Sequence, residues 1–183
     1  MKEDHKTIPE VSVVIPVYNA EKYLRQTMSY LLYQTLEEIE FIFVDDGSSD
    51  HSVSIIEEYM QMHPNKISLY HTDHTGPGGA RNKGIECARA DYIGFADADD
   101  YMEYNMYEKM LHAAKDGNHD LVCTPYYLVR DDKKRIHGRI NQPVKKDQLI
   151  FHGEVAFWNK LIHKDLLHQT GKIPQIWFED TAY

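Results

Sequence analysis

The chain has 183 residues, and its 20 Lys and Arg against 29 Asp and Glu give a formal net charge of −9. This length predicts one compact domain, and a hydrophobic content of 42% is enough for a core, which argues against a wholly disordered chain. The negative balance argues against a general nucleic-acid binder, which needs a basic face, but not against a nucleotide that is held through metal ions.

Strands and helices are predicted to alternate over the first 120 residues. Short β-branched runs predict strands that are buried on both faces, as in a parallel sheet, and apolar residues three or four apart predict helices between them. The predicted strands are 11–17, 39–44, 67–70, 91–96 and 121–123, and the predicted helices are about 21–34, 51–62, 80–88 and 103–115. Asn19 is expected to cap the first helix, and Ser49 or Asp50 the second. The order predicts an α/β fold, with a Rossmann-like and mostly parallel sheet flanked by helices.

The alternating pattern weakens after about residue 128. Residues 131–135 are predicted to form an exposed hairpin tip, residues 155–162 form an amphipathic stretch, and a short helix is expected near 165–168. We therefore predict a single domain with a soft internal boundary near residue 125. Its parts are an N-terminal tail at 1–10, a first part at 11–125 and a second part at 126–183.

Acidic residues gather where two of the predicted strands end. Asp45 and Asp46 close the second strand, and Asp97 and Asp99 follow the fourth. Ligands of open α/β sheets bind outside the carboxyl ends of the strands. Carboxylates concentrated there need a compensating cation, and oxygen ligands suit Mg²⁺ or Mn²⁺. The alternative interpretation is that these residues are only helix caps and turn formers, which Asp also favours.

A glycine-rich segment follows the third predicted strand. Residues 76–81 begin as G-x-G but have Arg81 where a dinucleotide fingerprint needs its third glycine, and the absence of G-x-x-x-x-G-K-[ST] excludes a P-loop. A loop that opens a helix can still hold an anion, and the arginine fork suits a diphosphate. Tyr18, at the end of the first strand, is a candidate to stack on a base, although simple packing explains it equally well.

The rest of the sequence argues against a protein built on cysteine bridges or cysteine-bound metal, and against a secreted or membrane-spanning protein. Cys87 and Cys123 are too few for a disulfide framework or a CxxC metal site, and we interpret them as buried thiols in a reducing compartment. The charged start of the chain lacks the apolar segment of a secretory signal, and no run approaches the roughly 18 apolar residues of a membrane span. We therefore predict a cytoplasmic protein and leave open its peripheral attachment to the inner face of the cell membrane.

Four segments together resemble the family 2 glycosyltransferases, which have the GT-A fold. They match in order and spacing, and they are VSVVIPVYN at 11–19, VDDGSSD at 44–50, GARNKG at 79–84 and YIGFADADD at 92–100. The resemblance is strong over residues 11–125 and weaker beyond. There, WNKL at 158–161 and FED at 178–180 look like the family's W-x-K-L and E-D elements.

This resemblance implies a nucleotide-sugar site in the first part and an acceptor side in the second. The implied donor contacts are Tyr18 on the uracil of a UDP-sugar, Asp45 hydrogen-bonded to the base with Asp46 beside it, Arg81 near the base or diphosphate, and Asp97 on the ribose or metal side. The implied ligands of a Mn²⁺ or Mg²⁺ ion are Asp99 and Asp97. The implied catalytic base is Asp180, with Glu179 as the second candidate.

The implied reaction is metal-dependent transfer of the sugar, with inversion, to the hydroxyl of a saccharide, lipid-linked or polymer acceptor. A carboxylate would act as general base, while the metal and Arg81 would stabilise the leaving diphosphate. Because family members continue with further acceptor-side helices, we expect the part at 126–183 to be incomplete. Two alternatives stay open: a non-catalytic nucleotide-sugar-binding module and, less favoured, a sugar nucleotidyltransferase. The latter would carry a glycine-rich basic loop where residues 18–21 stand.

Overall fold

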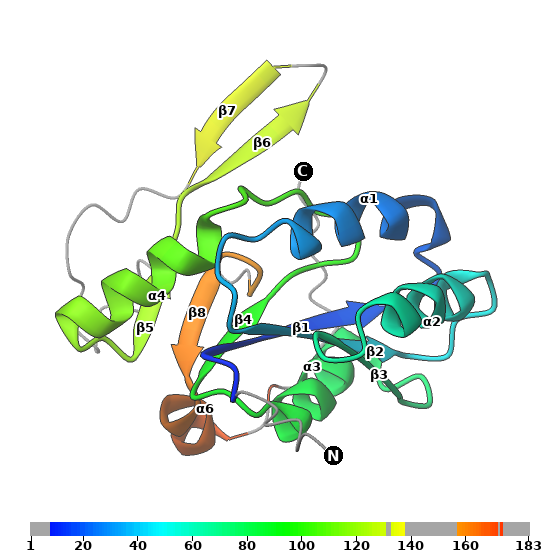
Figure 1. The fold of residues 1–183 in the computed structure, drawn as a ribbon, viewed down its shortest axis with the longest axis horizontal. Coiled ribbons are helices and arrows are strands. Elements are labelled where there is room, and N and C mark those ends of the chain that lie inside the picture. The colour runs from blue at the N-terminus through cyan, green and yellow to red at the C-terminus, as the bar shows by residue number, and fades with distance from the viewer. Residues whose placement is uncertain (1–7, 131–132, 138–156, 172, 174–183) are drawn as a thin grey trace, which may run out of the picture.

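The computed structural model describes residues 8–130, 133–137, 157–171 and 173. A six-stranded sheet forms the centre of the fold, with helices on both of its faces (Figure 1). In spatial order its strands are β3 (Ile67–His71), β2 (Ile39–Asp45), β1 (Val11–Val17), β4 (Tyr92–Phe95), β8 (Lys160–His163) and β5 (Leu121–Cys123). The helices are α1 (Glu21–Leu32), α2 (Ser52–Met62), α3 (Gly76–Cys87), α4 (Met106–Gly117) and α6 (Lys164–Thr170).

Strands β3, β2, β1 and β4 pair in parallel, which confirms the predicted fold class. Every residue of β2 is buried, and β1 leaves only Pro16 partly exposed. Such strands need apolar side chains on both faces, which explains why β-branched and aromatic residues dominate them. Among the buried exceptions, Ser12 donates a hydrogen bond to Glu40, and Glu40 is also paired with Arg89. The carboxyl ends of β1, β2 and β3 therefore lie at one edge of the sheet, and the chain leaves β4 beside β1.

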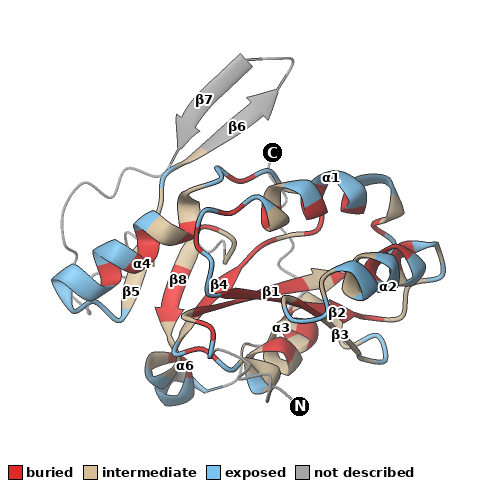
Figure 2. Cartoon of the chain, in the orientation of Figure 1, coloured by how far each residue is buried: buried red, intermediate tan, exposed pale blue. Residues whose placement is uncertain are grey.

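The two faces of the sheet carry separate hydrophobic cores. Helices α1, α2 and α4 bury residues such as Leu24, Ile56 and Met110 on one face. Helices α3 and α6 cover the other face, where Leu167 and Ala80 are buried. Figure 2 shows the buried residues along the strands and on the inner sides of the helices. None of the helices in the described part of the chain combines the length and the apolar character that crossing a bilayer requires.

Strand β8 joins the sheet from far along the chain. It lies between β4 and β5 and is antiparallel to both, with Leu161 and Ile162 buried. The sequence indicated an amphipathic stretch here but no strand, because four residues are too few to show alternation. Residues on both sides of the boundary expected near residue 125 therefore share one sheet.

A two-stranded antiparallel hairpin of β6 (Tyr126–Arg130) and β7 (Lys133–His137) projects away from this body (Figure 1). The hairpin predicted around residues 131–135 is thus confirmed, although its tip at 131–132 lies outside the described residues.

One predicted helix cap is wrong. Asn19 has a positive φ of 51°, and its Oδ1 accepts a hydrogen bond from the backbone N–H of Ser49 rather than from α1. Asp50 serves two helices instead, because its carboxylate accepts the N–H of Glu21 in α1 and of Ser52 in α2. Since β1 and β2 are parallel neighbours, the loops that follow them lie together, and each supplies hydrogen-bond acceptors to the other.

Candidate functional site at the carboxyl edge of the sheet

The loops that leave β1, β2, β3 and β4 bring together most of the residues singled out by sequence. Asp45 lies at the end of β2 and is only 3% exposed. Its carboxylate faces the backbone N–H groups of Gly47 and Ser48, each at 3.3 Å, and the Nδ1 atom of His71 lies 3.5 Å from its Oδ2. A carboxylate has about four acceptor positions, so this group, held in place by its own loop, can accept a further hydrogen bond from a ligand.

Asp46, the next residue, binds the start of α3. Its Oδ1 accepts hydrogen bonds from the Thr72 hydroxyl at 2.7 Å and the Thr75 N–H at 2.8 Å, and its Oδ2 accepts the Gly76 N–H at 2.7 Å. Burial alone raises the pKa of Asp46, but these hydrogen bonds together outweigh burial and hold the pKa below its ordinary value. Asp46 thus fixes the β3–α3 loop, and its contact with a nucleotide stays a prediction.

Tyr18 stands exposed directly after β1, with 58% of its surface accessible. Its ring meets that of His74 edge to face, with 5.7 Å between centroids. His74 adopts a positive φ of 49° and packs over Gly47, where an added Cβ would lie 2.8 Å from the imidazole. An exposed aromatic ring can stack on a planar heterocycle, and this role of Tyr18 stays a prediction.

Sequence reasoning missed His71 and His74. Ligands bind at the carboxyl ends of the strands, and this rule, which singled out the aspartates, also applies to the loop after the third strand. The position of the two histidines was therefore a usable signal. The positive φ of His74 was not readable from the sequence, in which nothing marks this residue as left-handed.

Arg81 and Asp97 form an ion pair within this site. The Nη2 atom of Arg81 lies 2.8 Å from Oδ1 of Asp97, and the guanidinium carbon lies 5.4 Å from the centroid of the Phe157 ring. The arginine side chain is only 13% exposed, and its buried Nε has no hydrogen-bond acceptor among the described residues. A guanidinium that is fixed in this way, with one N–H unused, is suited to an anionic ligand.

The loop after β4 holds Asp97 and Asp99 in different environments. Ala98 between them is buried, and its carbonyl accepts a hydrogen bond from the Thr27 hydroxyl at 2.7 Å, whereas Asp99 is exposed. Below the loop, burial raises the pKa of Tyr107 far above its ordinary value, and the charges of Asp97 and Asp100 add to that rise. The phenol therefore stays protonated and donates to the carbonyl of Phe95 at 3.0 Å.

The donor set at this loop fits a divalent cation of the magnesium type. No group of three or more His, Cys, Asp or Glu side chains gathers around one point in the part of the chain that the structure describes. Mg²⁺ usually takes only one or two protein carboxylates and completes its shell with phosphate oxygens and water. Asp97 and Asp99 are the first two carboxylates that this loop offers after β4, and their joint ligation of a cation stays a prediction. Both predicted catalytic residues, Glu179 and Asp180, lie outside the described residues.

The sequence of this chain is similar to a known protein family and to curated relatives. The family model described as Glycosyl transferase family 2 matches residues 12–175. EpsH of Bacillus subtilis (strain 168), which carries a glycosyltransferase name, is 36% identical over 167 residues, covering 87% of this chain and 48% of the relative. The chain spans about half the length of the curated relatives that it matches first.

Solved structures agree with the fold. Residues 1–349 of TarS from S. aureus, in complex with UDP, match with a TM-score of 0.76 at 22% identity, covering 91% of this chain and 50% of that one. The mannosyltransferase PcManGT from Pyrobaculum calidifontis, in complex with GDP-Man and Mn²⁺, matches with a TM-score of 0.70 at 17% identity, covering 92% and 48%. These likenesses establish a shared architecture.

Proposed function

Since the chain belongs to glycosyltransferase family 2, we propose that it transfers a sugar from a UDP-sugar to an acceptor hydroxyl, with inversion and with the aid of a divalent cation. The acceptor in this proposal is a saccharide, whether single, lipid-linked or polymeric. The reaction would take place in the cytoplasm, at the inner face of the membrane where the acceptor is lipid-linked.

The observation that carries the proposal is the setting of Arg81. Its guanidinium is held between Asp97 and Phe157, with a buried Nε–H that finds no acceptor among the described residues, at the same edge as Asp45 and Tyr18. We assign the diphosphate to Arg81, the uracil to Tyr18 and Asp45, and the cation to Asp99 and Asp97. When bound, the cation would neutralise charge that develops on the leaving diphosphate. The UDP complex of TarS, which has this fold, supports the nucleotide assignment.

The proposed chemistry is a single displacement. The acceptor hydroxyl oxygen attacks the anomeric carbon as the bond from that carbon to the diphosphate oxygen breaks, and the hydroxyl proton passes to a carboxylate. Asp180 is the proposed base, with Glu179 as the second candidate, and general-base help of this kind is worth roughly 10²–10⁴ in rate. Arg81 would donate hydrogen bonds to the diphosphate as its charge grows.

Thermal unfolding with UDP tests the donor site. Because a ligand that binds only the folded state stabilises it by mass action, UDP with Mn²⁺ at about 100 times its Kd should add about 2.7 kcal/mol. We expect a clear rise in Tm for the native chain and for Asp180→Asn, and a much smaller rise for Asp99→Asn. The exposed Asp73→Asn is the control for loss of a surface charge and should behave as the native chain.

The absence of any shift at millimolar UDP with either Mn²⁺ or Mg²⁺ would overturn the proposal. An equal shift in the native chain and Asp99→Asn would overturn the metal assignment alone.

A further inference from the structure

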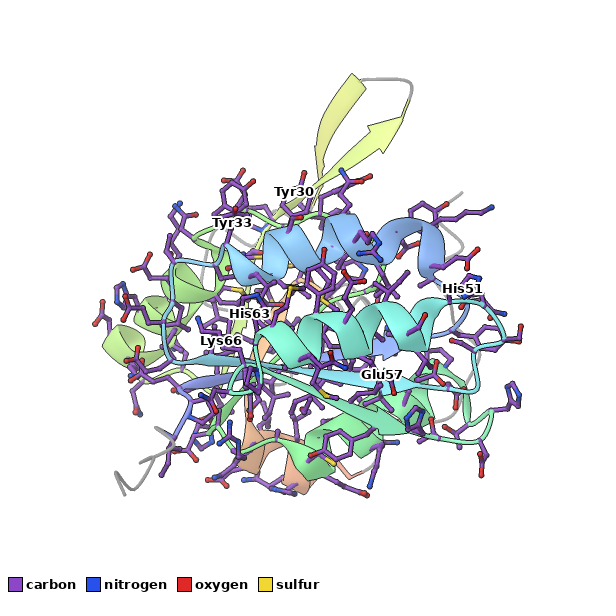
Figure 3. All side chains as sticks on the ribbon, turned by 45° about the vertical axis from the view of Figure 1, so that its right-hand side comes forward. Tyr30, Tyr33, His51, Glu57, His63 and Lys66 are labelled. Atoms are coloured by element: carbon purple, nitrogen blue, oxygen red, sulfur yellow. The ribbon has the colours of Figure 1, made fainter. Side chains whose placement is uncertain are left out.

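Four tyrosines form a continuous aromatic surface, which we call the tyrosine platform: Tyr30 on α1, Tyr33 directly after it, and Tyr101 and Tyr104 in the segment after β4. Tyr30 stacks on Tyr104 with 5.8 Å between ring centroids and meets Tyr101 edge to face at 5.4 Å, while Tyr33 meets Tyr104 at 6.1 Å. Tyr33, Tyr101 and Tyr104 are 71%, 61% and 52% exposed. Figure 3 shows Tyr30 on the outer side of α1 and Tyr33 where this helix ends.

The platform is held in place by backbone contacts between its two elements. The Thr27 hydroxyl on α1 donates to the carbonyl of Ala98, and just after α1 the Gln34 amide donates to that of Glu103 and the Thr35 N–H to that of Tyr104 at 2.8 Å. Three anchors of this kind hold the backbone that carries Tyr101 and Tyr104 against α1 and the residues that follow it, and the ring-to-ring contacts order the side chains. A pre-ordered surface loses little conformational freedom on binding, which favours recognition.

The platform begins next to the candidate site at Tyr101 and extends along α1 to Tyr33 and Tyr104, which lie toward the end of the sheet where β2 starts. Tyr101 follows Asp99 by two residues, so at most about 7 Å of extended chain separates their α-carbons. The same backbone that presents Asp97 and Asp99 at the sheet edge then runs along α1 to Tyr104. A molecule that reacts at the metal site and extends over α1 would therefore lie on these rings.

We propose that the tyrosine platform binds a neutral saccharide chain, the acceptor of the transfer reaction, and this inference rests on the proposed function. Tyrosine offers a large apolar face together with a hydroxyl that hydrogen-bonds, which matches a pyranose ring with its C–H face and its peripheral hydroxyls. The platform consists of phenols rather than aliphatic side chains, and this composition favours a polyhydroxylated partner over a purely apolar one.

The charges around the platform select a neutral partner. Acidic residues adjoin the end of α1 and Tyr104: Glu37 and Glu38 follow α1, Glu103 precedes Tyr104, and Glu108 accepts a hydrogen bond from Thr35. The basic residues of α1, Lys22 and Arg25, lie in its first half, and Arg25 is paired with Glu58. An anionic lipid surface needs basic residues at its contact, and a phosphate-rich polymer would be repelled for the same reason. An uncharged saccharide needs no basic residues and is not repelled by the acidic ones.

Binding of labelled oligosaccharides tests the inference. Fluorescent linear tetramers of glucose, galactose and N-acetylglucosamine are titrated with the native chain, and polarisation is followed. We expect at least one tetramer to bind and the variant with both Tyr33→Ala and Tyr104→Ala to bind it about tenfold more weakly or worse. The variant with both Tyr33→Phe and Tyr104→Phe should retain most of the affinity, because it keeps the rings. Tyr23→Ala, which removes another exposed tyrosine from α1, should bind as the native chain.

The outcomes separate this inference from the proposed function. Both tyrosine double variants should keep the Tm rise with UDP and Mn²⁺, since that rise reports the donor site. A native chain that shows the UDP shift but binds none of the tetramers overturns the platform assignment alone, whereas tetramer binding without a UDP shift overturns the proposed function alone. Equal losses in Tyr23→Ala and the alanine double variant overturn the assignment. So does binding to anionic vesicles, or self-association, that the alanine double variant abolishes while tetramer binding is unchanged.

Discussion

At the scale of single residues, the adjacent Asp45 and Asp46 make different contacts. The carboxylate of Asp45 faces N–H groups of its own loop and lies near His71, whereas that of Asp46 accepts four hydrogen bonds from Thr72, Thr75 and Gly76. Sequence placed both at the edge of the sheet but could not divide their roles, because the partners of Asp46 are 26 to 30 residues away.

Substitution of Asp46 should reveal a pH-dependent contribution to stability. Asp46→Asn replaces an ionised acceptor of backbone N–H groups with a neutral amide, and we expect it to lower the free energy of unfolding at pH 7 by about 2 kcal/mol. Because the pKa of Asp46 is lowered in the folded state, its contribution is present above the ordinary carboxyl pKa of about 3.9 and is lost as the pH falls through the folded value. The difference between native and variant should therefore hold from pH 7 to about 5 and shrink below about 4.

Urea unfolding at a series of pH values measures this difference. Asp73→Asn, in the same loop but exposed, is the matched control and should stay within about 0.5 kcal/mol of the native chain throughout. A difference for Asp46→Asn that is the same at pH 7 and pH 3 would show that the charge of Asp46 is not what the loop requires.

At the scale of elements, α3 depends on close contact more than on an apolar stripe. Its sequence begins Gly-Pro-Gly-Gly, and the proline stands in the first turn, where its missing N–H costs nothing. Gly84 packs on β1 so tightly that an added Cβ would lie 2.2 Å from Cγ1 of Val14. Arg81 lies one turn earlier on the same helix, so this contact also sets the height of the guanidinium above the sheet edge. Sequence indicated the helix and its arginine, but the contact exists only between elements 70 residues apart.

A methyl group at residue 84 should therefore disturb both stability and the site. We expect Gly84→Ala to lower the free energy of unfolding by about 1–3 kcal/mol, since the side chains of a packed core cannot move aside without strain. It should also reduce the Tm rise with UDP and Mn²⁺, because α3 would carry Arg81 away from Asp97.

A double-mutant cycle with Val14→Ala identifies the clash. Removing the two methyl groups of Val14 opens the space that the alanine needs, so the two substitutions together should cost less than the sum of their separate effects. Strict additivity in chemical unfolding would mean that some other consequence of the substitution, such as a change in the unfolded chain, accounts for the loss.

At the scale of the whole molecule, the predictable part of the fold is the part in which neighbours in sequence are neighbours in space. The strands β1 to β4 are rich in β-branched and aromatic residues and follow one another through helices, so pattern and connection rules suffice. These rules do not predict strand β8. It has four residues, its partners β4 and β5 lie about 40 to 70 residues earlier, and its antiparallel direction follows from that return.

Truncation should show that β8 is required for the fold. A chain of residues 1–157 lacks β8, the strand that pairs with both β4 and β5. Backbone groups of Ile93 and Val122 would then lose their hydrogen-bond partners in the sheet. The hydrophobic cluster around Phe95 would lose Ile162 and Leu167 from its cover. We expect this chain to lose cooperative thermal unfolding and to bind the dye ANS, as loosely packed states do. A chain of residues 1–173, which keeps β8 and α6, should unfold cooperatively within a few degrees of the full chain. If residues 1–157 also unfolded cooperatively near that temperature, the first four strands and their helices would be an independent folding unit, and β8 only an addition to its edge.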